Sequence, residues 1–270
     1  MADAAKTRRA LALAVWIIGG IAIALALSRR WLPPLASEHG AGVDRMLHYS
    51  LLTTGIMIVA GHGVLGYVLW RFGGRDRIGF RMASRKTERR WSLVAGVCMA
   101  VVAEGGVLAL GLPVWKQYFG STAPANALTI EVTTEQFAWN VRYAGPDGLF
   151  GRTDPKLIRL DNPLGMDAAD SHGKDDIVSL NVLHAIVGRP VRIRLRSKDV
   201  LHSFFLPNLR VKQDSVPGMT IDFWFTPTRT GRFELACAQL CGFGHYEMRG
   251  VLIVESAEEW ARWAEEQLHG

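Results

Sequence analysis

The sequence predicts a membrane-anchored α+β protein, with helices in the first part of the chain and an exported β domain in the rest. Long uncharged runs lie before residue 120, and apolar and polar residues alternate after residue 128. Lys and Arg number 15 against 6 Asp and Glu up to residue 120, and 16 against 19 beyond it, so the formal net charge of +6 divides into +9 and −3. With 270 residues, 49% of them hydrophobic, and three cysteines, the chain is neither disordered nor a disulfide scaffold.

Two runs of 25 residues with little or no charge, Met46 to Trp70 and Trp91 to Trp115, predict a helical hairpin in a membrane. Each exceeds a hydrocarbon core of about 30 Å at about 1.5 Å per residue, whereas buried helices of soluble proteins, the alternative, rarely run so long without charge. Eight basic residues lie in and beside the connecting loop: Arg71, Arg75, Arg77, Arg81, Arg85, Lys86, Arg89 and Arg90. Basic short loops mark the cytoplasmic side, so this charge indicates topology, not a nucleic-acid surface, and residues after 120 are exported.

A third run, Ala10 to Ser28, has 19 uncharged residues between basic flanks. It fits a signal peptide, with Ala24-Leu25-Ala26 resembling a cleavage site, or a retained helix with its N-terminus inside. Its length exceeds the usual apolar region of about 7 to 15 residues, which favours the retained helix. The predicted segments are 1–45 for this helix or signal segment and an outer loop, 46–120 for the hairpin, 121–256 for the exported domain and 257–270 for a terminal helix.

Glu104 stands near the middle of the second hairpin run. An ionised carboxylate is costly at that depth, so we expect Glu104 to face protein or water. It is either part of a proton path or partner contact, or a neutral acid hydrogen-bonded in a helix interface. His62, in the other run, lies about five residues closer to the cytoplasmic side, so we expect no pair between them.

Alternation with the strand period predicts β structure after residue 128, most clearly in Val191 to Arg196, where apolar residues face a core and arginines face water. The other candidate strands are Leu128 to Thr133, Trp139 to Tyr143, Ile177 to Leu180, Thr220 to Thr226, Arg232 to Ala236 and Gly250 to Glu255. Short strands separated by turn signals predict a mostly antiparallel sandwich or barrel. The tail from Ala257 to Leu268 is typical of an amphipathic helix packed on this domain.

An acidic, Gly- and Pro-containing stretch lies between Ala144 and Asp176. Carboxylates of this kind can bind calcium, but their spacing matches no EF-hand loop. A solvated insertion is the favoured interpretation.

The run from Cys237 to Met248 carries the strongest chemical signal. It places two cysteines four residues apart, a histidine four residues later and a methionine three beyond that. His202, at the predicted end of the strand that begins near Val191, supplies a second histidine. Soft sulfur together with imidazole selects copper or zinc over hard cations.

Ligand stoichiometry separates the candidate metals. A mononuclear blue-copper site would leave one cysteine spare, and a zinc site would leave Met248 without a role. Two thiolates bridging two coppers, with one histidine and one weak axial ligand for each metal, use all five side chains. The alternative is a disulfide between Cys237 and Cys241, but such a short loop is strained, and Gly242 and Gly244 indicate a backbone bent for close approach.

Together these features resemble subunit II of the haem-copper oxidases, the cytochrome c oxidase family. The resemblance rests on the Cys-x3-Cys-x3-His-x2-Met run, on Val-Leu-His-Ser at 200–203, on Lys-x-Asp-x-x-Pro-Gly at 212–218 and on the hairpin before the β domain. It implies a cupredoxin-like antiparallel β-barrel or sandwich with a dinuclear CuA centre of two copper ions. The implied copper ligands are His202, Cys237, Cys241, His245, Met248 and the main-chain carbonyl of Gln239.

Three further features of the sequence bear on the family pattern. Gln239 replaces a usual glutamate whose carboxylate reaches a magnesium ion shared with subunit I, which puts magnesium in doubt but leaves carbonyl ligation possible. Phe137 and Trp139 lie in the run that corresponds to the family's electron-uptake cluster, and packing residues are the alternative. Glu88, three residues before Trp91, fits a glutamate associated with a proton path, and a solvated loop acid is the alternative.

The resemblance implies a function in respiratory electron transport. The exported domain would accept electrons from cytochrome c and pass them to haem in subunit I, where oxygen is reduced to water, with subunit III as a further partner. The chain would lie in the bacterial cell membrane with its copper domain on the periplasmic or outer face. The alternatives are a membrane-tethered copper-binding electron-transfer protein and the CuA subunit of a nitric oxide reductase, whereas a quinol-oxidase subunit II would lack the copper ligands.

Overall fold

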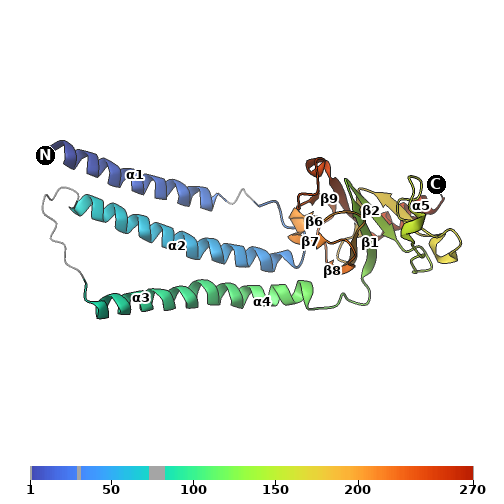
Figure 1. The fold of residues 1–270 in the computed structure, drawn as a ribbon, viewed down its shortest axis with the longest axis horizontal. Helices are drawn as coiled ribbons and strands as arrows, with labels where there is room; N and C mark the ends of the chain where they lie inside the picture. Colours follow the sequence, from blue (N-terminus) through green and yellow to red (C-terminus); the bar gives the residue numbers. More distant parts are fainter. Residues whose placement is uncertain (1, 29–31, 73–82, 270) are drawn as a thin grey trace. The chain divides into compact units, whose positions relative to one another are not determined.

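The computed structural model describes residues 2–28, 32–72 and 83–269 (Figure 1). The chain forms two compact units, one of residues 1–32 and 44–113 and the other of residues 33–43 and 114–270. The predicted outer loop therefore contributes residues 33–43 to the second unit. The basic residues Arg29, Arg30, Arg75, Arg77 and Arg81 lie outside the described residues.

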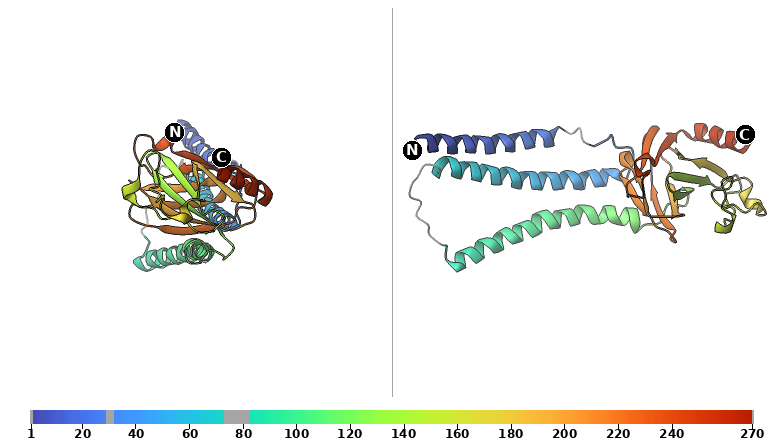
Figure 2. Two further views of the ribbon diagram at one scale, coloured as in Figure 1. Left: turned by 90° about the vertical axis from the view of Figure 1, so that its right-hand side faces the viewer. Right: turned by 45° about the horizontal axis from the view of Figure 1, so that its top comes forward.

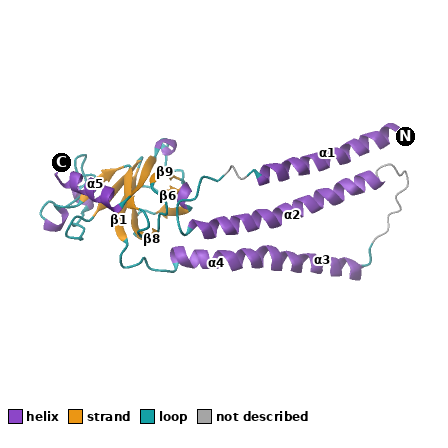
Figure 3. Cartoon of the chain, turned by 180° about the vertical axis from the view of Figure 1, so that it is seen from behind, coloured by secondary structure: helices purple, strands orange, loops and turns teal. Residues whose placement is uncertain are grey.

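The N-terminal part of the described chain is helical, and the strands gather in the C-terminal part (Figure 3). The helices are α1 (Ala2–Leu27), α2 (Gly40–Phe72), α3 (Arg85–Met99), the π-helical turn η1 (Ala100–Glu104) and α4 (Gly105–Phe119). Within the described residues, three helical stretches are long and apolar enough to cross a membrane: Lys6–Leu27, Gly40–Phe72 and Arg85–Phe119, with mean hydropathies of 2.6, 1.6 and 2.2. The predicted membrane-anchored α+β class is confirmed.

Within the first unit, α1 packs on α2 through small residues. A methyl group added at Gly66 would lie 2.7 Å from Cδ1 of Trp16, so only glycine leaves room for the indole ring. The Trp16 ring in turn stacks on Trp70 with 6.1 Å between ring centroids, and the Arg9 guanidinium lies 5.4 Å from the Trp70 ring. Close approach at small residues is the usual way in which membrane helices associate.

The second unit contains a sandwich of two five-stranded sheets. Their orders are β3-β2-β1-β5-β8 and β4-β10-β9-β6-β7. The strands are β1 (Leu128–Glu135), β2 (Ala138–Tyr143), β3 (Ile177–Leu180), β4 (Val182–Ile186), β5 (Val191–Ser197), β6 (His202–Leu206), β7 (Val211–Ser215), β8 (Ile221–Phe225), β9 (Gly231–Cys237) and β10 (Arg249–Glu255). The seven predicted strands are present, and β4, β6 and β7 are additional. Most pairs are antiparallel, but β1 pairs with β5, and β4 with β10, in parallel.

One sequence expectation is wrong: His202 does not end the strand that begins at Val191. That strand, β5, ends at Ser197, and His202 opens β6 in the other sheet. Between them the Ser197 hydroxyl donates to the carbonyl of Val200 at 2.6 Å, which closes a tight turn. The chain therefore crosses from one sheet to the other at residues 198–201.

The core lies between the two sheets, as the alternation in β5 predicts. Val191, Ile193 and Leu195 are fully buried. Helix α5 (Ala257–His269) packs on the same core, as expected for the amphipathic tail (Figure 2). Its Trp263 ring stacks on His184, with 3.9 Å between centroids. The short 3₁₀ helices of the domain are η2 (Pro155–Leu157), η3 (Ser171–Gly173), η4 (Pro207–Leu209) and η5 (His245–Glu247).

Candidate metal centre

The predicted metal ligands gather at one end of the second sheet. Strands β6 and β9 are antiparallel neighbours, so the start of β6 lies beside the end of β9. His202 is the first residue of β6, and Cys237 is the last residue of β9. The loop from 238 to 248 then returns to β10, and it is fixed at both ends because Ala238 N–H donates to Ser203 O at 3.0 Å and Cys237 N–H donates to Met248 O at 3.2 Å.

The donor atoms of this loop converge on the two thiols. The Sγ atoms of Cys237 and Cys241 are 3.8 Å apart. Nδ1 of His245 lies 3.6 Å from Cys241 Sγ, and Sδ of Met248 lies 3.9 Å from it. The carbonyl oxygen of Gln239 is 3.2 Å from Cys237 Sγ. One ligand atom each from His202, Cys237 and Cys241 lie within 4.8 Å of one another, so all six predicted ligands lie together.

The cysteines of the site are free, buried thiols and are not bonded to each other. Burial alone raises the pKa of the Cys237 thiol, but the neighbouring His202 ring and the polar groups of the loop and of Ser203 outweigh burial and lower the pKa to about 6. Burial, followed by the negative charge of Cys237, raises the pKa of Cys241 to about 12. The first thiol is thus ready to bind a metal as a thiolate near neutral pH.

The ring of His202 is oriented for ligation. It is fully buried, and its Nε2 lies 2.8 Å from Oδ1 of Asp199. Its Nδ1 is buried and has no hydrogen-bond partner among the described residues. A histidine that binds a metal through one nitrogen commonly donates the other N–H to a carboxylate, which fixes the ring and the tautomer. The orphaned Nδ1 beside two thiols therefore fits a copper ligand.

Asp199 is a residue of the site that the sequence pattern does not mark. Besides His202, it accepts hydrogen bonds from the main-chain N–H groups of Gln136, at 2.7 Å, and Val200, at 2.6 Å. Burial opposes the charged carboxylate, but these hydrogen bonds prevail and lower its pKa. The only sequence signal was an acid three residues before a candidate histidine, which is weak because a sequence does not show where that acid points.

The turn between β1 and β2, residues 136–137, covers the ligand loop. The Gln136 amide donates to the carbonyl of Cys241 at 2.6 Å. The half-buried Phe137 ring lies against the loop glycines, since a methyl group added at Gly244 would lie 2.6 Å from its Cε2 atom. Gly242, with φ of +137°, would bring a methyl group to 2.7 Å from the Gln136 amide nitrogen. The predicted bend of the backbone for close approach is therefore present at these two glycines.

Trp139 differs from Phe137, its partner in the predicted uptake cluster. It is fully buried in the core, with its ring edge-on to Phe204 at 5.7 Å between centroids. Its N–H group on the main chain donates to Asn181 Oδ1 at 2.8 Å. Direct contact of the Trp139 ring with an external donor therefore requires rearrangement of the core.

The two membrane-side acids lie apart from the metal ligands in sequence and belong to the hairpin. Glu88 is in the first turn of α3, which Ser84 caps by accepting from Thr87 N–H, and an acid there favours the helix dipole. Glu104 is exposed and ends the π-helical turn. The proton-path role of both remains a prediction.

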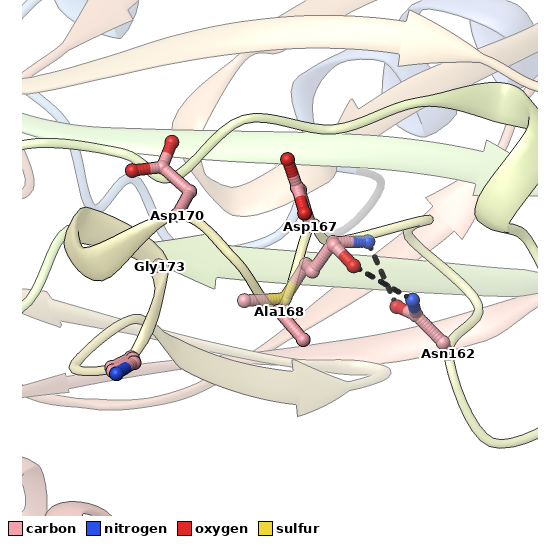
Figure 4. Close-up of a pocket in the computed structure, with 7 residues that line it drawn as sticks. Asn162, Asp167, Ala168, Asp170 and Gly173 are labelled. Atoms are coloured by element: carbon pink, nitrogen blue, oxygen red, sulfur yellow. Dashed lines mark hydrogen bonds between the residues drawn. The ribbon is translucent and has the colours of Figure 1, made fainter.

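The carboxylates of the acidic stretch between Ala144 and Asp176 form ion pairs and hydrogen bonds with residues of the same domain. Asp147 lies 2.7 Å from Nδ1 of His172, and Asp167 pairs with Arg152 at 3.1 Å. Asp176 pairs with the buried Arg142 at 3.0 Å. Figure 4 shows a pocket in this region, where Asn162 bonds the main chain of Met166 in both directions and where none of the predicted copper ligands contributes to the lining. These contacts favour the interpretation of the acidic stretch as a structural insertion.

Comparison with known proteins agrees with this arrangement. Residues 128–256 match the family described as cytochrome c oxidase subunit II, periplasmic domain. The "Alternative cytochrome c oxidase subunit 2" of Bradyrhizobium diazoefficiens is 38% identical over 261 residues, which cover 96% of this chain and 91% of that protein. The cytochrome c oxidase subunit 2 of Cereibacter sphaeroides is 27% identical over 216 residues, or 76% of this chain and 69% of that protein.

A solved structure is also similar: the periplasmic domain of subunit II of cytochrome oxidase from Bradyrhizobium japonicum. It is 30% identical with a TM-score of 0.40, and the match covers 54% of this chain and 96% of that chain. The family assignment rests on the sequence matches, above all on the relative that aligns over nearly the whole chain. Three apolar helices precede a domain that the family places in the periplasm. The chain is a membrane-anchored member of the cytochrome c oxidase subunit II family of haem-copper oxidases.

Proposed function

We propose that this chain is the electron-accepting subunit of a bacterial haem-copper oxidase and holds two copper ions as a CuA centre. The observation that carries the proposal is the convergence of two thiols, the thioether of Met248, two imidazoles and one carbonyl at the end of the second sheet. No mononuclear site uses all of these donors.

The ligands proposed for copper are His202, Cys237, Gln239 through its carbonyl, Cys241, His245 and Met248. A dinuclear copper centre held by these residues would supply one-electron transfer. The chain itself fixes the positions of the ligand atoms. Cys237 is held by the β9 ladder, His202 by Asp199, and the rest of the loop by Gln136 and by main-chain bonds to β6 and β10.

Cytochrome c is the proposed donor, and Phe137 is the proposed point of electron uptake. The support is that its ring contacts the ligand loop while remaining half-exposed. Around it the loop presents apolar side chains to the outside, since Leu240 is 77%, Phe243 103% and Tyr246 70% exposed. Large exposed apolar side chains clustered beside a functional site are typical of protein-binding surfaces. Trp139 is proposed to support Phe137 from the core.

Subunit I is the proposed acceptor, with haem as the group that receives the electron and oxygen reduced to water there, and subunit III is a further proposed partner. Magnesium binding by this chain is not favoured, because Gln239 offers an amide where a carboxylate would be needed. Glu88 is proposed to lie at a proton path into subunit I. The proposed location is the bacterial cell membrane.

Copper stoichiometry and electron paramagnetic resonance test the proposal directly. The full-length chain, purified in detergent and loaded with copper, should bind about two copper ions and give hyperfine lines from one electron shared by two nuclei. Cys237→Ser should abolish the signal, whereas Cys98→Ser, a cysteine change in the membrane helix, should leave it intact. One copper per chain with single-nucleus hyperfine lines would instead identify a mononuclear copper module.

A further inference from the structure

Glu104 is an exposed carboxyl group in the middle of a membrane-spanning helix. It lies 13 residues after Trp91 and 11 before Trp115, which is about 20 Å and about 17 Å along the helix at about 1.5 Å per residue. It has no hydrogen bond or ion pair among the contacts of the described residues, and the surface around it is accessible. Ionisable groups at such depth face protein or water, because contact with lipid tails is costly.

The chain's own neighbouring helix cannot cover Glu104. Helix α2 contacts the η1–α4 segment through Tyr49. The Tyr49 hydroxyl donates to the carbonyl of Val102, and its ring fills the space beside Gly106. Residues two apart in an α-helix lie about 200° apart around its axis, so Gly106, with the Tyr49 ring beside it, is on the side opposite to Glu104. The Tyr49 contact therefore turns Glu104 away from α2.

The π-helical turn Ala100–Glu104 lies at this same level. Such turns insert one residue into a helix and leave a main-chain carbonyl with altered bonding, and they occur frequently at functional sites. Here the Tyr49 hydroxyl bonds a carbonyl inside the turn. The turn and its bond to α2 thus fix the direction in which Glu104 points.

Apolar residues extend the Glu104 surface along the helix. In the α-helical part that follows the turn, three exposed side chains share the face of Glu104: Leu108 at 55%, Leu112 at 58% and Trp115 at 61%. We call these three residues and Glu104 the Glu104 stripe. Apolar residues of the stripe would be satisfied by lipid, but the carboxyl group of Glu104 would not.

We propose that the Glu104 stripe packs against a transmembrane helix of another oxidase subunit that presents a hydrogen-bond donor, neutral or cationic, at mid-membrane. This inference rests on the proposed function, since it takes the oxidase complex as the partner. The carboxyl group gives the contact its chemistry, because a donor in a partner helix satisfies Glu104 and is satisfied by it. Leu108, Leu112 and Trp115 supply the apolar packing beside it.

Assembly of the complex tests the proposal. Glu104→Leu removes the acceptor and leaves a buried partner donor unpaired, so haem recovered per tagged full-length chain after detergent extraction should fall about tenfold. Glu104→Asp should restore most of the haem. Glu104→Gln separates the two kinds of donor: normal assembly indicates a neutral donor, and loss equal to that of Glu104→Leu indicates a cationic one.

Two controls make the result interpretable. Leu52→Ala, at an exposed apolar position of α2, should leave haem recovery unchanged, and the amount of chain in the membrane should be equal for all variants. The dinuclear copper signal of each variant reports the proposed function separately, since the copper ligands lie outside this helix. Wild-type haem recovery with Glu104→Leu, while the copper signal is intact, overturns the inference and leaves the proposed function standing.

Discussion

Replacement of Gly244 by alanine should destabilise the periplasmic domain through a single steric contact. Gly244 has φ of −88° and ψ of 13°, which an alanine can adopt, so backbone strain is not the cause. The added methyl group would lie 2.6 Å from Cε2 and 2.9 Å from Cγ of Phe137, whereas ordinary contacts lie at 3.4 to 4 Å. Either the ring or the ligand loop must therefore move by about 1 Å, which costs about 1–3 kcal/mol in a packed region.

A double-mutant cycle isolates that contact. In a Phe137→Ala background the ring is gone, and Gly244→Ala should then change the free energy of unfolding by less than about 0.5 kcal/mol. Gly188→Ala is the matched control, because Gly188 has φ of +73° and nothing within 4 Å of the added methyl group. Its cost of about 1 kcal/mol is backbone strain and should be the same in both backgrounds.

Urea unfolding of the full-length chain in detergent, followed by the optical bands of bound copper, measures each cost. The same bands report whether the ligand loop has shifted before unfolding begins. An equal cost of Gly244→Ala with and without the Phe137 ring would refute the packing of that ring on the ligand loop. It would also remove the structural support for electron uptake at Phe137.

Other substitutions test single contacts. Asp199→Asn should weaken copper binding about 10–100-fold in chelator competition, because it alters the acceptor that orients His202; unchanged affinity would argue against that role. Met248→Leu should keep copper but change its reduction potential, measured by redox titration, and an unchanged potential would exclude an axial methionine. Trp263→Ala should lower the free energy of unfolding by about 3 kcal/mol in urea, because α5 loses its ring stack on the core. The mature chain should still contain Lys6 by intact mass, since α1 packs on α2 as a retained helix would; a start after Ala26 would show cleavage.

The features that could be predicted are those set by residues close together in the sequence. Strand alternation located β5 and β10, because each residue in a half-buried strand records which face of the sheet it occupies. The ligand loop was equally visible, since Cys237, Cys241 and Met248 lie within one short segment and their spacing survives folding. Membrane helices were found by their length and their lack of charge.

The unpredicted features are non-local. The parallel pairing of β1 with β5 joins residues more than 60 positions apart, and no local pattern reports which strand becomes a neighbour. His202 was correctly selected as a ligand by chemistry, yet its place in β6 was missed because the turn after Ser197 carries no glycine or proline. Three consecutive polar residues, Ser197, Lys198 and Asp199, interrupt the alternation there and were the available sign of the turn.

Asp199 shows how such a turn couples parts of the site that the sequence keeps separate. One carboxylate oxygen accepts from the Gln136 main chain, next to Phe137, and the other lies against Nε2 of His202. The turn that carries the proposed uptake residue and the ring that carries a proposed copper ligand are thus fixed to the same side chain. Because the two bonds are short, at 2.7 and 2.8 Å, and meet on one carboxylate, they tie the turn that carries Phe137 to the His202 ring and favour a constant distance between them.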